Sequence, residues 1–260
     1  IPASEGGLGS DGWEGVESFL NVTTDKVYKN NEWEYGYREN DPLDGYDPYS
    51  NSKSCSELVT HSYKSSFFAD GRTGISTARA GNVIGGGDYS NDRIIPDCVR
   101  AIQTAVADGA DRASVSVRNP YSTRPYQHVL EPLFMYLEIA IRQLDDRRYE
   151  GYYNVGPDDA DCVHTGRLVD IFCEKWNEDK GDLPQMSWEN VAEKDAPHEA
   201  SFLKLDTSRV KSVFGWKPVW HIDRALEETV KFFKVWLLGK DVRAEMDRQI
   251  EEFIKQRKSG

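Results

Sequence analysis

Apolar residues follow two alternating patterns along the chain, short continuous runs and longer stretches with helical spacing. The short runs predict strands at residues 16–22, 74–84, 114–117, 152–155 and 203–205. The longer stretches predict helices at residues 49–68, 94–107, 129–144, 166–176, 208–214, 222–238 and 242–256. Leu58, Val59, Tyr63 and Phe67 are expected to form the apolar face of the first of these helices. Strands that alternate with helices are typical of an α/β fold with a parallel sheet.

A long segment separates the first predicted strand from the first predicted helix. Residues 28–48 are rich in Asn, Asp, Gly and Pro, which favours loop structure. Because most connections in compact domains are much shorter, we expect this segment to form a lid or a wall of a site.

The composition narrows the classes of protein that the chain can belong to. A hydrophobic fraction of 38% is enough to build a core. The excess of 44 acidic over 32 basic residues gives a net charge of −12, which argues against a broad nucleic-acid-binding surface. The four cysteines and five histidines show no metal-ligand spacing, and no apolar run is long enough to span a membrane. With no visible signal peptide, we interpret the cysteines as free thiols of a cytoplasmic protein without a metal site.

Polar residues follow two of the predicted strands. Thr24, Asp25 and Lys26 come directly after the first strand, and residues 81–87 lie at the end of the second. Ligands of open parallel sheets bind beyond the carboxyl ends of the strands. We therefore expect these two segments to meet at one site.

Tyr49 and Lys53 lie four residues apart, on one face of the predicted helix. An unperturbed phenol has a pKa of ~10 and is a poor base at neutral pH. A nearby ammonium lowers that pKa and makes the phenolate useful for removing a proton from a sugar hydroxyl during hydride transfer. This spacing is common by chance, so the segments around the tyrosine–lysine pair have to support the interpretation.

Several linked segments resemble the extended short-chain dehydrogenase/reductase family, and within it the CDP-glucose 4,6-dehydratases. The resemblance runs from about residue 17 to about residue 235. The segments that carry it are NVTTDKVY (21–28), YDPYSNSK (46–53), ARAGNVIGGGD (78–88), DRIIPD (92–97), RNPYSTRPYQHV (118–129), YNVGP (153–157), LKLDTS (203–208) and GWKP (215–218). Their order along the chain is more specific than any one of them.

The resemblance implies roles for five residues in the dehydration of a nucleoside-diphosphate hexose. Tyr49 would take the proton of the sugar 4-hydroxyl while hydride leaves C4 for NAD. Lys53 would hold the phenolate and the nicotinamide ribose, and Thr24 would hydrogen-bond the 4-oxygen. Asp25 would protonate the departing 6-hydroxyl, and Lys26 would remove the C5 proton. The Asp-Lys pair marks the CDP-glucose subtype, since relatives that act on dTDP-glucose or GDP-mannose carry a glutamate at the second position. An ion pair at the start of a loop is the other interpretation of these two residues.

The resemblance also implies contacts with cofactor and substrate. Ala80 would contact NAD together with Tyr49 and Lys53. Asn82, Arg93 and Arg124 would bind the substrate diphosphate and nucleotide, with Gln127 close to them, because the guanidinium fork suits a phosphate. For either arginine alone, a surface ion pair is the alternative. His128 either orients the following helix or touches a ligand, and we do not include it in the site.

The chain departs from the family in one respect, since it contains no G-x-x-G-x-x-G fingerprint after a strand. We therefore expect an incomplete Rossmann-type parallel sheet with an interleaved smaller α/β substrate domain. Residues 1–91 would be the carboxyl-side half of the NAD-binding domain. Residues 92–260 would mainly form the nucleotide-sugar-binding domain, with residues 126–155 returning to the Rossmann sheet. The strand at 16–22 would lack neighbours on one side.

Two functional hypotheses follow. In the first, the chain belongs to an NAD-dependent dehydratase that makes a CDP-4-keto-6-deoxyhexose for deoxysugar or surface-polysaccharide synthesis. By resemblance the full-length protein would form a homodimer through the helix at 49–68 and a second helix. Without the missing half, we expect this chain alone to bind NAD poorly and to be inactive. In the second hypothesis it is a truncated, non-catalytic nucleotide-sugar-binding remnant. A related epimerase is a further alternative.

Overall fold

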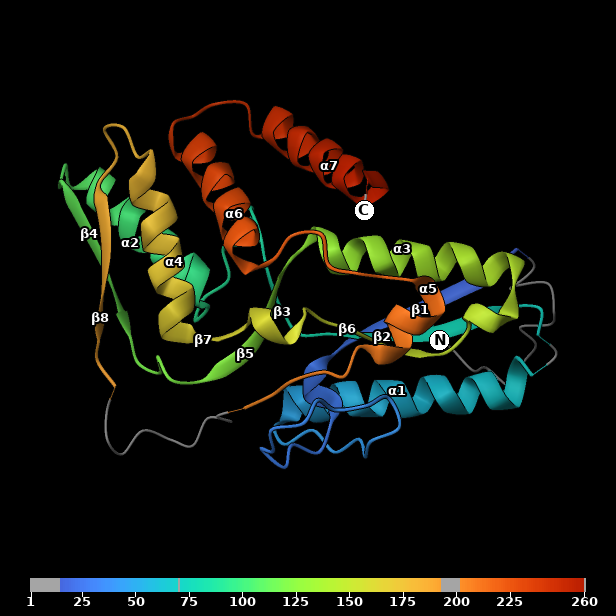
Figure 1. Cartoon of the computed structure of the whole chain (residues 1–260). Coiled ribbons are helices and arrows are strands. Elements are labelled where there is room, and N and C mark those ends of the chain that lie inside the picture. Colours follow the sequence, from blue (N-terminus) through green and yellow to red (C-terminus); the bar gives the residue numbers. More distant parts are fainter. Residues whose placement is uncertain (1–14, 70, 193–201, 260) are drawn as a thin grey trace, which may run out of the picture.

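The central element of the fold is a three-stranded parallel sheet with helices on both faces (Figure 1). The computed structural model describes residues 15–69, 71–192 and 202–259. The strands are β1 (Ser18–Thr24), β2 (Gly74–Ala80), β3 (Asn82–Ile84), β4 (Arg112–Val117), β5 (Thr123–His128), β6 (Tyr152–Val155), β7 (Cys162–His164) and β8 (Gln185–Asn190). The α-helices are α1 (Pro48–Phe67), α2 (Ile94–Ala107), α3 (Leu130–Asp145), α4 (Thr165–Glu178), α5 (Ser208–Phe214), α6 (Ile222–Leu237) and α7 (Val242–Ser259). The described residues also form three short 3-10 helices, η2 (Asp25–Val27), η3 (Arg147–Tyr149) and η4 (Asp159–Asp161).

The central sheet has the strand order β1-β2-β6, and all of its pairings are parallel. Helix α3 packs on one face and α1 on the other (Figure 1). Within the described residues β1 pairs only with β2, and it leaves Phe19 and Val22 exposed. The α/β class and the parallel sheet are as predicted. The expected lack of a second neighbour for the first strand is also seen.

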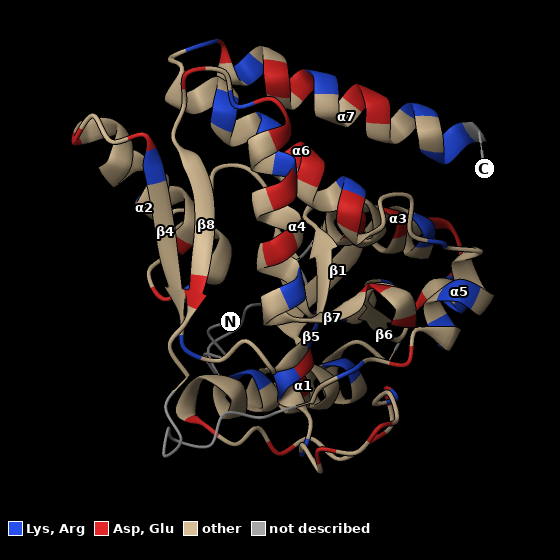
Figure 2. Ribbon diagram, turned by 60° about the vertical axis from the view of Figure 1, so that its left-hand side comes forward, with Lys and Arg blue, Asp and Glu red and all other residues tan. Residues whose placement is uncertain are grey.

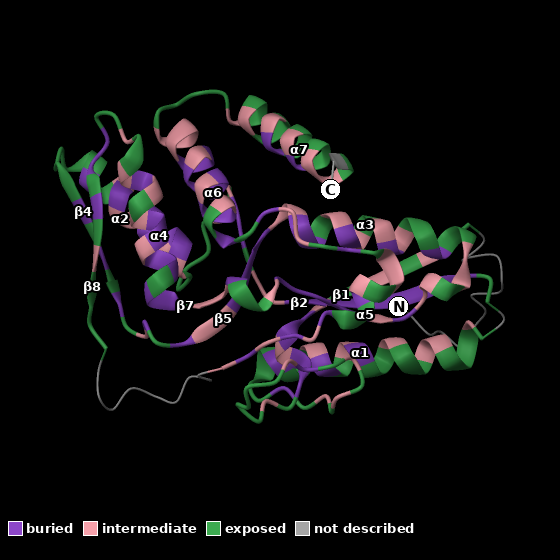
Figure 3. Cartoon of the chain, viewed as in Figure 1, coloured by how far each residue is buried: buried purple, intermediate pink, exposed green. Residues whose placement is uncertain are grey.

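Two smaller sheets lie beyond the central one. In one of them β5 pairs with β3 in parallel and with β7 in antiparallel orientation, and the other joins β4 and β8 in parallel. A large apolar core lies between these strands and helices α2, α4 and α6, and it includes Phe172, Trp176 and Phe233. Figure 3 shows the buried inner sides of α2, α4 and α6. All four cysteines are free thiols.

Two predicted strands were wrong, and three strands were missed. The strand expected at 74–84 is two strands, because the chain leaves the central sheet at Gly81 and joins a different one. Residues 203–205 form no strand, and Leu205 makes only an isolated bridge with Tyr37. Strands β5, β7 and β8 were not predicted, since β5 contains a proline and β8 is mostly polar.

Helix α1 is turned the opposite way to the prediction. Ser50, Ser54 and Glu57 are its buried residues, whereas Leu58, Val59 and Phe67 are exposed. The reason is that polar side chains of the central sheet form hydrogen bonds and an ion pair with this side of the helix, as described below.

The segment before α1 is a fixed wall. Two backbone hydrogen bonds join Tyr37 of this segment to residues 204–206. They run from Tyr37 N to Lys204 O at 3.0 Å and from Asp206 N to Tyr37 O at 2.8 Å. A small apolar core of Val27, Tyr28, Tyr37, Leu203 and Leu205 lies beneath this contact. Of the two roles expected for residues 28–48, these contacts fit the wall.

Ion pairs hold the two carboxyl-terminal helices together. Figure 2 shows acidic and basic positions interspersed along α6 and α7. The fully buried carboxylate of Glu228 is bound by Arg224 at 2.8 Å, by Lys231 at 3.0 Å and by Arg248 of α7. No helix in the described ranges is both long and apolar enough to cross a membrane.

Glu131, in the first turn of α3, is buried beneath the segment that leads into α6. Its Oε1 accepts hydrogen bonds from the backbone nitrogens of Val219 and Trp220, both at 2.7 Å. Burial raises the pKa of this carboxyl from 4.5 to about 7, although the two N–H groups oppose the change. A carboxyl with a raised native pKa binds more protons in the folded state, so its contribution to stability falls as the pH rises from 4.5 through 7.

Glu131→Gln removes this titration while keeping an oxygen for the two N–H groups. As the pH rises from 5 to 8.5, we expect the difference in the free energy of unfolding to shift in favour of the variant by about 1–3 kcal/mol, because only the wild type loses this contribution. Urea denaturation at several pH values measures the difference. A difference that does not change with pH would contradict the assignment.

Candidate active site

The carboxyl ends of the three central strands lie side by side. Thr24, the last residue of β1, pairs with Ala80, the last residue of β2, and Ala80 pairs with Val155 at the end of β6. The parallel register therefore brings Thr24 and the segment after Ala80 to one edge, as the sequence predicted.

A compact polar cluster follows β1. The Thr24 hydroxyl donates to Asp25 Oδ1 at 3.0 Å, and Lys26 Nζ donates to the same oxygen at 2.9 Å. Lys26 Nζ also reaches Asn82 Oδ1 at 3.3 Å, which joins the cluster to the chain after β2. The Asp25 side chain is fully buried, while Lys26 is 32% exposed. Asp25 Oδ2 is buried without a hydrogen-bond partner in the described part of the chain.

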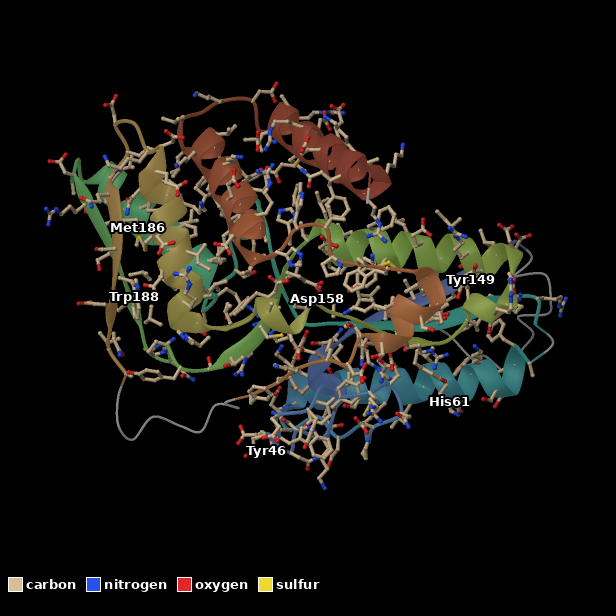
Figure 4. All side chains as sticks on the ribbon, viewed as in Figure 1. Tyr46, His61, Tyr149, Asp158, Met186 and Trp188 are labelled. Atoms are coloured by element: carbon tan, nitrogen blue, oxygen red, sulfur yellow. The ribbon has the colours of Figure 1, made fainter. Side chains whose placement is uncertain are left out.

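Tyr49 and Lys53 lie in the first two turns of α1. Lys53 Nζ is 5.8 Å from the centroid of the Tyr49 ring, and Tyr49 is 52% exposed. The helix begins beside the polar cluster, because Ser54 Oγ donates to Val27 O at 2.8 Å and accepts from Gly45 N at 3.1 Å. Asp47 caps this end by accepting from Ser50 N at 3.0 Å. Tyr46 lies just before the helix and is 99% exposed (Figure 4).

Gly81 lets the chain pass between the cluster and β5. A Cβ at this position would lie 2.6 Å from Pro125 Cγ, 2.8 Å from Pro125 O and 3.3 Å from Asp25 Oδ2. Close approach of backbone is a common reason for glycine in or beside a strand. Asp25, Asn82 and Pro125 thus surround one point, at which the chain changes sheets.

The four residues predicted to bind substrate are only partly brought together. Asn82 lies in the cluster through Lys26. Gln127 is buried, and its Nε2 donates to Val155 O at 2.8 Å, so it joins β5 to the end of β6. Arg124 donates to Thr123 O at 3.1 Å, and Arg93 is exposed at the start of α2. Within the described residues, no hydrogen bond or ion pair connects either arginine to the cluster.

Other residues near the site were not identified from the sequence. Tyr136 of α3 is close enough to Asp25 for that charge to add to the effect of burial, and both raise the pKa of the phenol. His128 was left out, and the structure shows its Nδ1 accepting from Leu130 N at 3.3 Å, at the start of α3. Neither residue has a sequence signal of its own, because the contacts depend on how distant elements pack.

Comparison with known proteins identifies the family. A sequence model of the GDP-mannose 4,6 dehydratase family matches residues 12–229. The chain belongs to this family. It is 40% identical over 245 residues to the CDP-glucose 4,6-dehydratase of Salmonella typhimurium, covering 92% of this chain and 64% of that protein. It is 22% identical to the dTDP-D-glucose 4,6-dehydratase of Mus musculus, covering 85% of this chain and 56% of the relative. The chain thus spans less than two thirds of the length of these curated relatives.

Solved structures share the fold. The dTDP-glucose 4,6-dehydratase of Bacillus anthracis, solved in complex with NAD, superposes with a TM-score of 0.60 at 20% identity, over 82% of this family member and 60% of that chain. RMD from Pseudomonas aeruginosa, complexed with NADPH, gives a TM-score of 0.67 at 19% identity, over 86% and 68% of the two chains. At these identities the likeness establishes the fold alone.

The crowding around Gly81 can be tested by substitution. Gly81→Ala forces Pro125 and Asp25 apart, and we expect it to destabilise the protein by about 1–3 kcal/mol. Gly156→Ala is the matched control at the end of β6, because its Cβ would meet only ordinary contacts at 3.4 Å and beyond. Thermal unfolding of both variants measures the effect. Equal stability of the two would show that Gly81 does not hold the cluster against β5.

Proposed function

We propose that the chain carries the catalytic centre of an NAD-dependent CDP-glucose 4,6-dehydratase. The observation that carries the proposal is the contact between Asp25 and Lys26 at the end of β1, beside the helix that bears Tyr49 and Lys53. Such a pair supplies an acid and a base next to a tyrosine–lysine pair that serves oxidation. The identity of 40% with a CDP-glucose 4,6-dehydratase supports the substrate.

The first step is oxidation at C4 of the sugar. Tyr49 takes the proton of the 4-hydroxyl, and the Lys53 ammonium stabilises the phenolate. Thr24, at the carboxyl end of β1, is placed to hydrogen-bond the 4-oxygen. Bound NAD would supply the redox chemistry of the reaction, as the acceptor for the C4 hydride and later the donor to C6.

The residues present fit the nicotinamide end of that cofactor. Lys53 is half-buried and provides ammonium donors for the ribose, and Ala80 offers a small side chain at the end of β2. In the printed sequence, no predicted strand precedes a glycine-rich fingerprint of the kind that receives the pyrophosphate in such folds. The proposal for this chain therefore concerns the nicotinamide end.

The second step is elimination of water, for which one proton transfer prepares both groups. Movement of a proton from Lys26 Nζ to Asp25 Oδ1, across their contact of 2.9 Å, gives a neutral amine and a neutral carboxylic acid. Lys26 then takes the C5 proton, and Asp25 protonates the 6-hydroxyl, which leaves as water.

The cycle closes with proton return. Lys26 gives its proton back to C5 as C6 is reduced. Tyr49 releases the proton that it took from the 4-hydroxyl, and Asp25 takes one up from solvent. The sum is loss of one water from the sugar nucleotide.

The remaining predicted residues are assigned to the substrate. Asn82 uses Oδ1 for Lys26, so its amide nitrogen can donate to a diphosphate oxygen. Arg93 and Arg124 offer guanidinium forks for the diphosphate or nucleotide. Gln127 keeps Oε1 for a ligand or for orientation of β5, since its nitrogen is bound to Val155. We assign the cofactor to the region around β1-β2-β6 and the nucleotide sugar mainly to the part after residue 92. We assign the activity to deoxysugar synthesis in the cytoplasm, where free thiols stay reduced.

Mass spectrometry of CDP-glucose incubated with NAD and the full-length protein tests the function, since we expect this chain alone to be inactive. We expect a product that has lost one water, and Tyr49→Phe should lower its rate about 10²–10⁴-fold. Asp25→Asn should instead permit oxidation, seen as NADH absorbance, without release of water. A product of unchanged mass would contradict dehydration and indicate an epimerase.

We also propose that α1 forms an interface with a second copy of the chain. Its outward side carries Leu58, Val59 and Phe67, next to an apolar groove that includes Phe19 and Tyr63. We expect a dimer by analytical ultracentrifugation and a monomer for Leu58→Glu. The control Leu137→Glu, an exposed leucine on α3, should remain dimeric. A monomeric wild type at micromolar concentrations would refute the interface.

A further inference from the structure

A carboxylate lies buried on the side of α1 that faces the sheet, one turn beyond Lys53. Glu57 follows Tyr49 and Lys53 at the same spacing of four residues, so the three share one side of the helix. Its side chain is 1% exposed, whereas Tyr49 is 52% exposed. The proposed chemistry gives Glu57 no role, and its burial therefore needs another explanation.

Arg79 of β2 binds Glu57 through both arms of its guanidinium fork. The distances are 2.8 Å from Nε to Oε1 and 3.0 Å from Nη2 to Oε2, and the Arg79 side chain is only 2% exposed. Thr23 of β1 donates its hydroxyl to the same carboxylate. A bidentate pair fixes orientation as well as distance. Glu57 thus links α1 to two neighbouring strands.

The other side of Arg79 reaches the third strand and the wall segment. Its Nη1 donates to the Tyr28 hydroxyl at 2.7 Å and to Glu39 O at 3.0 Å. The Tyr28 hydroxyl donates in turn to Asn154 Oδ1 of β6 at 2.6 Å. The guanidinium is therefore held from several directions, and it cannot follow the helix if the helix turns.

Further polar contacts run along the same side of α1. Asn21 Nδ2 donates to Ser56 Oγ at 3.0 Å and to Thr60 Oγ1 at 2.8 Å, and His61 Nδ1 lies 2.6 Å from the Tyr152 hydroxyl (His61 is labelled in Figure 4). Burial of apolar surface is non-directional, whereas hydrogen bonds weaken steeply with angle. A helix docked by polar contacts is consequently fixed in rotation and in axial position.

We infer that Glu57 and Arg79 are positioning residues whose ion pair sets the rotation of α1 and thereby the placement of Tyr49 and Lys53 beside the segment that follows β1. The inference rests on the proposed function for its catalytic consequence, but the placement of the helix can be measured without it. One residue along an α-helix corresponds to about 100° of rotation and about 1.5 Å of rise. Since misplacement by about 1 Å can cost about 10²-fold in rate, a modest shift of α1 would be visible in activity.

The experiment compares three variants of the full chain. Glu57→Gln alone leaves Arg79 buried without a counter-charge and can prevent folding. The test variant is therefore the double substitution Glu57→Gln/Arg79→Gln, which replaces the ion pair by two neutral amides. Thr23→Val is the milder second variant, because it removes only the hydroxyl bond to Glu57. The matched control is Glu138→Gln/Arg142→Gln, which makes the same change in a partly exposed pair on α3.

Amide hydrogen exchange of α1, followed by mass spectrometry, is the readout independent of catalysis. We expect exchange in residues 48–60 to rise on the order of 10-fold in the double variant, and less in Thr23→Val, with α3 and the control unchanged. In turnover of CDP-glucose, we expect kcat to fall about 10–100-fold with little change in KM.

Wild-type exchange in α1 and an unchanged kcat in both test variants would overturn the inference. If the double variant does not fold, Thr23→Val decides by the same two measurements. If the wild type does not convert CDP-glucose, the proposed function fails, and the exchange data still decide whether the pair positions the helix.

Discussion

A carboxylate and a guanidinium meet in the seam between α1 and the central sheet, where neither side chain reaches water. Removing two charges from water is costly, and the cost is recovered only when the geometry is good and the remaining donors are satisfied. Glu57 and Arg79 meet this condition, since the guanidinium also binds Tyr28 and the backbone of Glu39. Loss of one partner from such a pair costs about 3–5 kcal/mol. The polar seam explains why α1 turns its apolar residues outward.

The position of the site follows from the sheet that this seam holds. The parallel register ends β1, β2 and β6 at Thr24, Ala80 and Val155, so the groups that follow these strands meet at one edge. Gly81 then carries the chain past Asp25 into the second sheet, and Asn82 contacts Lys26 as a result. The meeting of Asp25, Lys26 and Asn82 is therefore a consequence of strand register and of one close backbone approach.

Much of this arrangement could be predicted from local sequence, and the rest depends on distant partners. The α/β alternation and the helix bearing Tyr49 and Lys53 were visible because they depend on periodicity and spacing. The orientation of α1 was not, since its buried side is chosen by Arg79, by Asn21 and by the Tyr152 hydroxyl on other elements. Likewise β5 contains Pro125 and few apolar residues, so only its pairing with β3 and β7 makes it a strand. Neither the ion pair nor the burial of Gln127 has a signature in the residues next to it.

We propose that this edge of the sheet supports an internal oxidation, elimination and reduction on one sugar. CDP-glucose labelled with deuterium at C4 tests this proposal most directly, when it is incubated with the full-length protein and NAD and the product is examined by NMR. The deuterium is expected at C6 of a 4-keto-6-deoxy product. Deuterium that stays at C4 of an isomer, or that is lost to water, would contradict it.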